Sequence, residues 1–109
     1  MDRSVAMREP LQIFDIDRKA YAAKMADNLP VLRAKLGLSQ EGVAGVIGIT
    51  RQTISSIENK SREMSWPTFL SLLFLFSKNS DTQTLMKAMG IYDENLETYF
   101  TFTDLERLK

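Results

Sequence analysis

Apolar residues recur at helical spacing along most of the chain, in short stretches separated by residues that cap or stop helices. The first stretch runs from about Asp17 to Ala26, where Tyr21, Met25 and the alanines share one face. Asp17 stands where it could cap the start of this stretch. The pattern therefore predicts a short helix near the N-terminus.

Pro30 interrupts the pattern and allows two interpretations. Because proline has no N–H to donate, it fits the first turn of a new helix or a kink in a continuous one. We predict a new helix over Leu29–Leu36, capped by Asn28 and stopped by Gly37.

Two short helices with a very short connection come next. Ser39 caps a helix predicted over Gln40–Ile47, and Thr50 caps another over Arg51–Asn59. The residues expected to face inward are Val43, Val46 and Ile47 in the first helix and Ile54 and Ile57 in the second. Joined by Gly48-Ile49-Thr50, the pair makes a helix-turn-helix, in which the second helix lies at a steep angle to the first.

The next stretch is the most apolar of the chain. Ser65 caps it, Pro67 is tolerated in its first turn, and Phe69–Phe76 is apolar nearly all round. Such a helix is either central to the core or partly covered by a second chain. A further helix is predicted over Thr82–Met89, stopped by Gly90. Its inward residues are expected to be Leu85, Met86 and Met89.

The two ends of the chain are open to more than one interpretation. Leu11–Ile16 and Thr98–Thr103 both have the β-branched and aromatic content of strands, which could pair within one chain or across a dimer. A terminal helix capped by Asp93, with Leu96, Tyr99 and Phe100 packing, explains the second segment equally well.

Composition excludes several classes of protein. The chain has 109 residues, enough for one modest core. It has neither cysteine nor histidine, which excludes thiolate zinc sites, disulfides, cysteine nucleophiles and histidine-based triads. No apolar run is long enough to span a bilayer, and the N-terminus lacks the apolar stretch of a signal peptide. We therefore expect a cytoplasmic protein with no metal, no cofactor and no membrane contact.

Charge is balanced overall but unevenly distributed. The net charge is zero, yet residues 28–80 hold six Lys/Arg against three Asp/Glu, and residues 81–109 hold three against six. The middle of the chain can therefore meet phosphate groups, because the charge near the contact matters more than the total.

Gly42, Gly45 and Gly48 invite a comparison with phosphate-binding loops. Such a loop needs a buried strand that leads into the glycine turn, and nothing between Leu29 and Gln40 has a strand pattern. The spacing of three is not the dinucleotide fingerprint either. The glycines are better assigned to the outer face and the end of a helix.

The residues L-G-L-S-Q (36–40), G-I-T-R-Q-T-I-S-S-I-E-N (48–59) and the apolar helix opened by Ser65 resemble the Xre/Cro family of DNA-binding domains, typified by lambda-like phage repressors. The resemblance spans about Leu29 to Gly90. It implies an all-α, lambda repressor-like five-helix domain with a helix-turn-helix. We expect an N-terminal extension with a short helix (1–27), the DNA-binding domain (28–90) and a C-terminal extension available for dimerisation (91–109).

The same resemblance implies roles for individual residues. The side chains implied to face the major groove are Arg51, Gln52, Thr53, Ser55 and Ser56. It also implies phosphate contacts from Gln40 and Asn59, and a buried ion pair between Arg33 and Glu58.

Side-chain chemistry supports these roles independently. Arg51 can bond to guanine, Gln52 to adenine, and Thr53 can place its methyl group against thymine. Lys35, Lys60 and Arg62 suit phosphates. The alternatives are that the outward residues form only a solvated helix face and that the ion pair is exposed and of little value.

The chain departs from the family pattern within helix 40–47 and directly after helix 51–59, and its low net charge predicts weak non-specific affinity for DNA. Gly42 and Gly45 replace the usual polar helix formers, and Val46 stands where a basic residue is common. Lys60 occupies a position that often holds glycine, so Asn59 or Lys60 itself must make the exit turn.

The preferred hypothesis is a transcriptional regulator, specifically a repressor, that binds double-stranded DNA as a homodimer. Helix 51–59 of each copy would read the major groove of a pseudo-palindromic operator. The alternative is a protein-interaction module, such as an antitoxin component that binds a partner protein through its acidic, aromatic C-terminal tail. An enzyme is the least favoured class, because Asp15, Asp17, Asp93 and Glu94 fit caps and solvated charges better than acid/base pairs.

Overall fold

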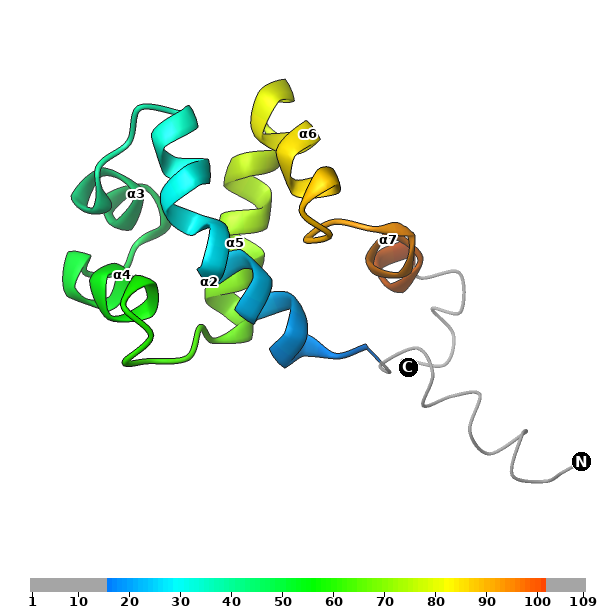
Figure 1. Cartoon of the computed structure of the whole chain (residues 1–109), viewed down its shortest axis with the longest axis horizontal. Coiled ribbons are helices and arrows are strands. Elements are labelled where there is room, and N and C mark those ends of the chain that lie inside the picture. The colour runs from blue at the N-terminus through cyan, green and yellow to red at the C-terminus, as the bar shows by residue number, and fades with distance from the viewer. Residues whose placement is uncertain (1–15, 102–109) are drawn as a thin grey trace, which may run out of the picture. The chain divides into compact units, whose positions relative to one another are not determined.

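The computed structural model of the chain describes residues 16–101, which form six α-helices and no strand. The predicted all-α fold with a five-helix domain is therefore confirmed for this part of the chain. The helices are α2 (Arg18–Lys35), α3 (Gln40–Ile47), α4 (Arg51–Glu58), α5 (Trp66–Ser77), α6 (Ser80–Ala88) and α7 (Glu94–Thr101). Residues 18–91, which contain α2–α6, form one compact unit (Figure 1). Helix α7 belongs to a second unit.

Helix α2 is continuous through Pro30, so the predicted break between two helices at Asn28 is wrong. An apolar stripe explains the continuity: Tyr21, Met25, Leu29 and Leu32 are all buried and recur on one face of the helix. Pro30 itself is exposed. Burial of this stripe offsets the loss of the backbone hydrogen bond that proline cannot donate. The predicted domain boundary between residues 27 and 28 falls inside this helix.

The capping residues chosen from the sequence begin the next three helices. The side chains of Ser39, Thr50 and Ser65 accept hydrogen bonds from the N–H groups of Gly42, Thr53 and Thr68, respectively. Helix α3 has the predicted bounds, and α4 ends at Glu58 with Asn59 as its C-cap. Pro67 lies in the first turn of α5, as predicted.

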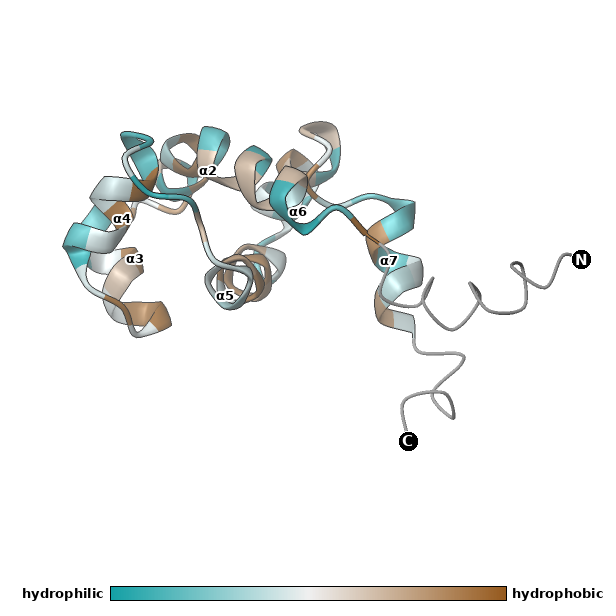
Figure 2. Ribbon diagram, turned by 90° about the horizontal axis from the view of Figure 1, so that it is seen from below, coloured by the Kyte–Doolittle hydropathy of each residue, from teal (hydrophilic) through white to brown (hydrophobic). Residues whose placement is uncertain are grey.

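The core of the unit lies between α2 and α5, and α3, α4 and α6 pack around them. Helix α5 is largely hydrophobic in Figure 2, and its residues Phe69, Leu72 and Phe76 are fully buried. Phe74 is 65% exposed on the same helix. Within this unit, therefore, the apolar surface of α5 is not buried all round.

Two details of the predicted helices are wrong. Val46, expected to face inward, is 62% exposed, whereas Ala44 is buried beside Val43. Helix α6 begins at Ser80 rather than Thr82, because the Asn79 side chain accepts from the N–H groups of Asp81 and Thr82 and caps the helix earlier. Of the residues expected inward here, Met86 is buried, and Leu85 and Met89 are partly exposed.

Helix α7 decides between the two interpretations of the C-terminal segment. The backbone N–H of Leu96 donates to Asp93 Oδ1 at 2.9 Å, so Asp93 caps a helix that runs to Thr101. The strand alternative is wrong for residues 98–101. Leu11–Asp15, in the other candidate strand, lie outside the described residues.

Candidate nucleic-acid interface

A tight turn and a cap fix where α4 begins. Gly48 has φ +83°, which favours glycine because other residues are strained there, and its N–H donates to Ala44 O at the end of α3. Two residues later the Thr50 side chain accepts from Thr53 N–H at 3.1 Å. Helices α3 and α4 lie side by side at one end of the unit (Figure 1).

Helix α4 has an apolar inner face and a polar outer face. Ile54 and Ile57 are buried, and the 100° step of an α-helix places Gln52, Ser55 and Ser56 opposite them. Arg51 and Gln52 are exposed, whereas Ser55 and Ser56 are partly exposed. The small serine side chains allow another surface to approach the helix closely.

Arg51 and Gln52 are free to bind an external group. Within residues 16–101 neither side chain has a hydrogen-bond or ion-pair partner. The guanidinium is a planar donor, and the amide carries both a donor and an acceptor. These are the groups that bond bidentately to guanine and to adenine in a major groove.

Thr53 is held by two neighbours. Its hydroxyl oxygen lies 2.9 Å from Thr50 Oγ1 and accepts from Arg62 Nη1 at 3.0 Å. Arg62, suggested by the sequence as a phosphate contact, thus reaches back from the loop after α4 to the first turn of that helix. Nothing in the sequence signals this contact, because the two residues are nine positions apart and share no element.

Arg33 and Glu58 tie α2 to α4. Arg33 Nε donates to Glu58 Oε2 at 2.7 Å and Nη2 donates to Oε1 at 3.0 Å, with side-chain exposures of 19% and 9%. Gln40 Nε2 also donates to Glu58 Oε1, at 2.9 Å. Gln40, suggested as a phosphate contact, therefore uses one of its two amide hydrogens within the protein.

The ionisation of this pair reflects the same contacts. Burial opposes the charged form of Glu58, but the hydrogen bonds from Arg33 and Gln40 and the charge of Arg33 outweigh it, so the pKa of Glu58 lies below its ordinary value of 4.5. The hydrogen bond to Glu58 raises the pKa of Arg33. Both groups are charged at neutral pH.

Lys60 makes the exit turn after α4. Its φ is +69°, an uncommon conformation for a residue other than glycine, while Asn59 Oδ1 accepts from Ser61 N–H. Lys60 Nζ forms an exposed ion pair with Asp27 on α2. The pair uses one of the three ammonium hydrogens of Lys60 and leaves the others for a phosphate. Lys35 is exposed and has no partner among residues 16–101.

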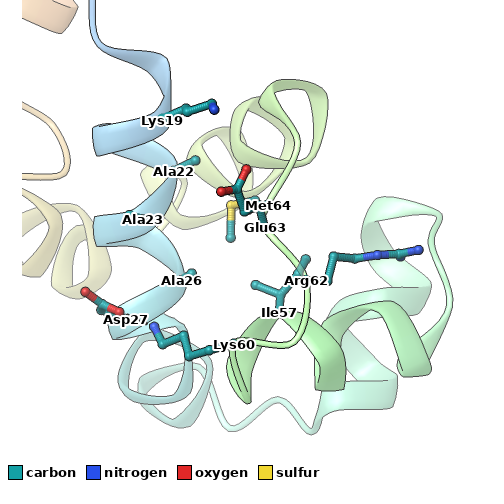
Figure 3. A pocket seen from close by; sticks show the side chains of 10 residues that line it. All are labelled: Lys19, Ala22, Ala23, Ala26, Asp27, Ile57, Lys60, Arg62, Glu63 and Met64. Atoms are coloured by element: carbon teal, nitrogen blue, oxygen red, sulfur yellow. Dashed lines mark hydrogen bonds and ion pairs between the residues drawn. The ribbon is translucent and has the colours of Figure 1, made fainter.

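A pocket of about 190 Å³ lies between α2 and the loop that follows α4. Its apolar lining includes Ala22, Ala26, Ile57 and Met64, and Figure 3 shows Lys60 pointing toward Asp27 while the Arg62 side chain extends away from the pocket. The volume is smaller than the ~300–1,000 Å³ typical of sites for small molecules. No group of three or more potential metal ligands occurs in the part of the chain that the structure describes.

Comparison with known proteins supports the assignment of this region. Residues 32–70 match the model of a helix-turn-helix family, a range that covers α3, α4 and parts of α2 and α5. Searches of curated proteins and of solved structures found no match. No helix in the described part of the chain is long and apolar enough to cross a membrane.

Proposed function

Because residues 32–70 form a helix-turn-helix of the Xre/Cro type, a DNA-binding and regulatory module, we propose that the chain is a sequence-specific transcriptional repressor that reads the major groove with α4. In this proposal it acts in the cytoplasm as a homodimer on a pseudo-palindromic operator. The family is one of regulators rather than of enzymes.

The outer face of α4 is the observation that carries the proposal. A B-form major groove admits a single α-helix, and the first turns of that helix reach the base edges. Arg51 and Gln52, in the first turn, are exposed and have no partner among residues 16–101. Ser55 and Ser56 continue this face and leave room for close approach. Arg51, Gln52, Thr53, Ser55 and Ser56 are therefore the proposed base-reading residues.

The backbone contacts are proposed around the ends of α3 and α4. Lys35 and Asn59 are exposed, and Gln40 retains one amide hydrogen at the start of α3. Lys60 would contribute by its remaining ammonium hydrogens, and Arg62 by its remaining guanidinium hydrogens. Contacts of this kind position a protein on the duplex without reading sequence.

A homodimer is proposed because one short helix reads few base pairs. Two copies of α4 would dock in successive major grooves about 34–36 Å apart, which matches an inverted repeat. Phe74, exposed on α5, is the candidate dimer contact within residues 18–91.

Selection of bound sequences from a random DNA pool tests this function. We expect enriched inverted half-sites. The Arg51→Ala substitution should then cost about 1–3 kcal/mol on the selected site and relax preference at one base pair. Lys35→Ala, which removes an exposed cation of the same unit, should weaken binding to every sequence and lower the salt dependence by about one charge.

The outcomes separate the possibilities clearly. Equal losses on selected and scrambled DNA for both variants would contradict base reading by Arg51. A pool without enrichment, together with binding that does not respond to salt, would contradict DNA recognition altogether.

A second candidate function rests on the charge of α7. Residues 92–101 include Asp93, Glu94 and Glu97 and no lysine or arginine, so this segment would be repelled by DNA. It suits a basic protein partner, as in an antitoxin component. Co-purification of one partner with the full chain, lost when Glu94 and Glu97 are replaced by glutamine, would favour this function.

A further inference from the structure

Arg62 closes a small network on the first turn of α4. Its Nη1 donates to Thr53 Oγ1 at 3.0 Å, and that oxygen lies 2.9 Å from Thr50 Oγ1. Thr50 Oγ1 also accepts from the Thr53 N–H at 3.1 Å. The hydroxyl of Thr53 is thus directed toward the helix cap and the loop after α4.

The bonding capacity of a hydroxyl decides what Thr53 can offer to a ligand. It has one hydrogen and two lone pairs. Arg62 occupies one lone pair, and the contact with Thr50 uses either the hydrogen or the second lone pair. One polar position at most remains, and it belongs to an oxygen that already faces two protein groups. The methyl group takes part in none of these bonds, and Thr53 is partly exposed.

Arg62 also affects the rotamer of Thr53. A threonine in a helix divides between two χ1 rotamers, because its hydroxyl can bond to a carbonyl of the preceding turn. The hydrogen bond from Arg62 and the contact with Thr50 favour the rotamer in which the oxygen faces them. Removing the guanidinium takes away one of these two contacts, so the second rotamer, in which the hydroxyl and the methyl group exchange places, should become populated.

We propose that Arg62 is a positioning residue that holds Thr53 so that its methyl group, and not its hydroxyl, reads the C5 methyl of a thymine in the major groove. This inference rests on the proposed function. Thr53 lies in the first turn of α4, the part of a recognition helix that reaches base edges. The major-groove edge of thymine differs from that of every other DNA base by its methyl group, which prefers apolar contact.

The role differs from that of an ordinary phosphate contact. A phosphate contact weakens all sequences alike when it is removed, because phosphates carry no sequence information. Orienting Thr53, in contrast, changes the discrimination between thymine and the same base without its methyl group. The two roles therefore predict different ratios of affinity.

The first measurement needs no DNA. Three-bond couplings of the Thr53 side chain in the full chain should report one χ1 rotamer, and Arg62→Met should average them between two. Lys35→Met is the matched control, since it removes another exposed cation. Couplings that are the same in Arg62→Met and in the unmodified chain would overturn the proposal, whatever the protein does with DNA.

The second measurement uses the site selected by the unmodified protein. Each thymine in turn is replaced by deoxyuracil, which lacks the methyl group. We expect one thymine in each half-site at which the replacement weakens binding about fourfold. This is the change in affinity that corresponds to the hydrophobic free energy of burying one methyl group. Thr53→Ser keeps the hydroxyl and should abolish this ratio, Arg62→Met should lower it, and Lys35→Met should leave it at about fourfold.

Each possible result bears on the proposal. It is overturned if no thymine is sensitive, if Thr53→Ser keeps the full ratio, or if Arg62→Met weakens both DNAs equally. In these cases the proposed function stands, because the unmodified protein still selects a sequence. Failure to select any sequence contradicts the function itself, while the couplings of Thr53 still test the effect of Arg62 on its rotamer.

Discussion

Replacing Arg33 with methionine tests how strongly the contact between α2 and α4 stabilises the fold. Methionine keeps an unbranched side chain of similar length and removes the guanidinium. The substitution deletes two hydrogen bonds to Glu58, at 2.7 and 3.0 Å, and one to Leu38 O at 3.2 Å. It leaves the Glu58 carboxylate, only 9% exposed, with Gln40 as its remaining side-chain donor.

The expected cost lies between two limits. A surface ion pair is worth about 0–1 kcal/mol. Breaking a fully buried pair costs about 3–5 kcal/mol, because one charge is left without compensation. Arg33 is 19% exposed, so water can replace part of what is lost. We therefore expect a loss of about 2–3 kcal/mol in the free energy of unfolding, or roughly 10–20 °C in Tm for a unit of this size.

Urea unfolding followed by circular dichroism at neutral pH measures this cost. A cycle with Arg33→Met, Glu58→Gln and the double variant should give a coupling energy above about 1 kcal/mol. Lys35→Met, on the same helix, should change stability by less than about 0.5 kcal/mol. A loss of less than about 0.5 kcal/mol for Arg33→Met would refute the reasoning and identify a solvated pair.

Four further results are expected. The pKa of Glu58 is lowered in the folded state, so the unfolded chain takes up the proton first on acidification. The unmodified chain should therefore exceed Glu58→Gln in stability by the full amount above the ordinary pKa of 4.5, and this difference should shrink as the pH falls through the lower pKa of the folded state. Unfolding free energies measured at a series of acidic pH values test this. Gly45→Ala should stabilise the protein by about 0.8–1 kcal/mol in urea unfolding, because alanine is the better helix former and its methyl group would lie in open space. Gly48→Ala should destabilise it by about 1–2 kcal/mol, because φ +83° is strained for alanine. Lys60→Gly should be more stable than Lys60→Ala by about 1 kcal/mol, because both lose the exposed ion pair and only alanine keeps the strain at φ +69°; equal midpoints would exclude that strain. Phe74→Ser should shift a dimer toward monomer in sedimentation equilibrium, and an unchanged dissociation constant would exclude α5 as the dimer contact. At concentrations at which the unmodified chain is monomeric, the same substitution should leave the unfolding free energy within about 0.5 kcal/mol.

Local chemistry made the starts of the central helices predictable. Ser39, Thr50 and Ser65 are caps whose oxygens satisfy nearby N–H groups, so their effect depends only on neighbouring residues. The buried positions of α4 followed from helical spacing for the same reason. Such features can be inferred from a short stretch of sequence.

Features that depend on tertiary packing were harder to predict. Pro30 disfavours a helix locally, but the buried stripe around it keeps α2 continuous. Val46 is apolar and still exposed, because Ala44 takes the inner position of α3. The Asp27–Lys60 contact joins residues far apart in sequence, and the Thr53–Arg62 contact joins a helix to the loop that follows it. The exposed charges themselves give no sign of these partners.

The residues that hold α4 and the residues that it presents outward are different sets. Ile54, Ile57 and Glu58 attach the helix to its neighbours, whereas Gln52, Ser55 and Ser56 take no part in the buried core. The outward positions can therefore be randomised together while the scaffold persists. If α4 reads DNA, a library at these three sites should yield folded proteins retargeted to new operators.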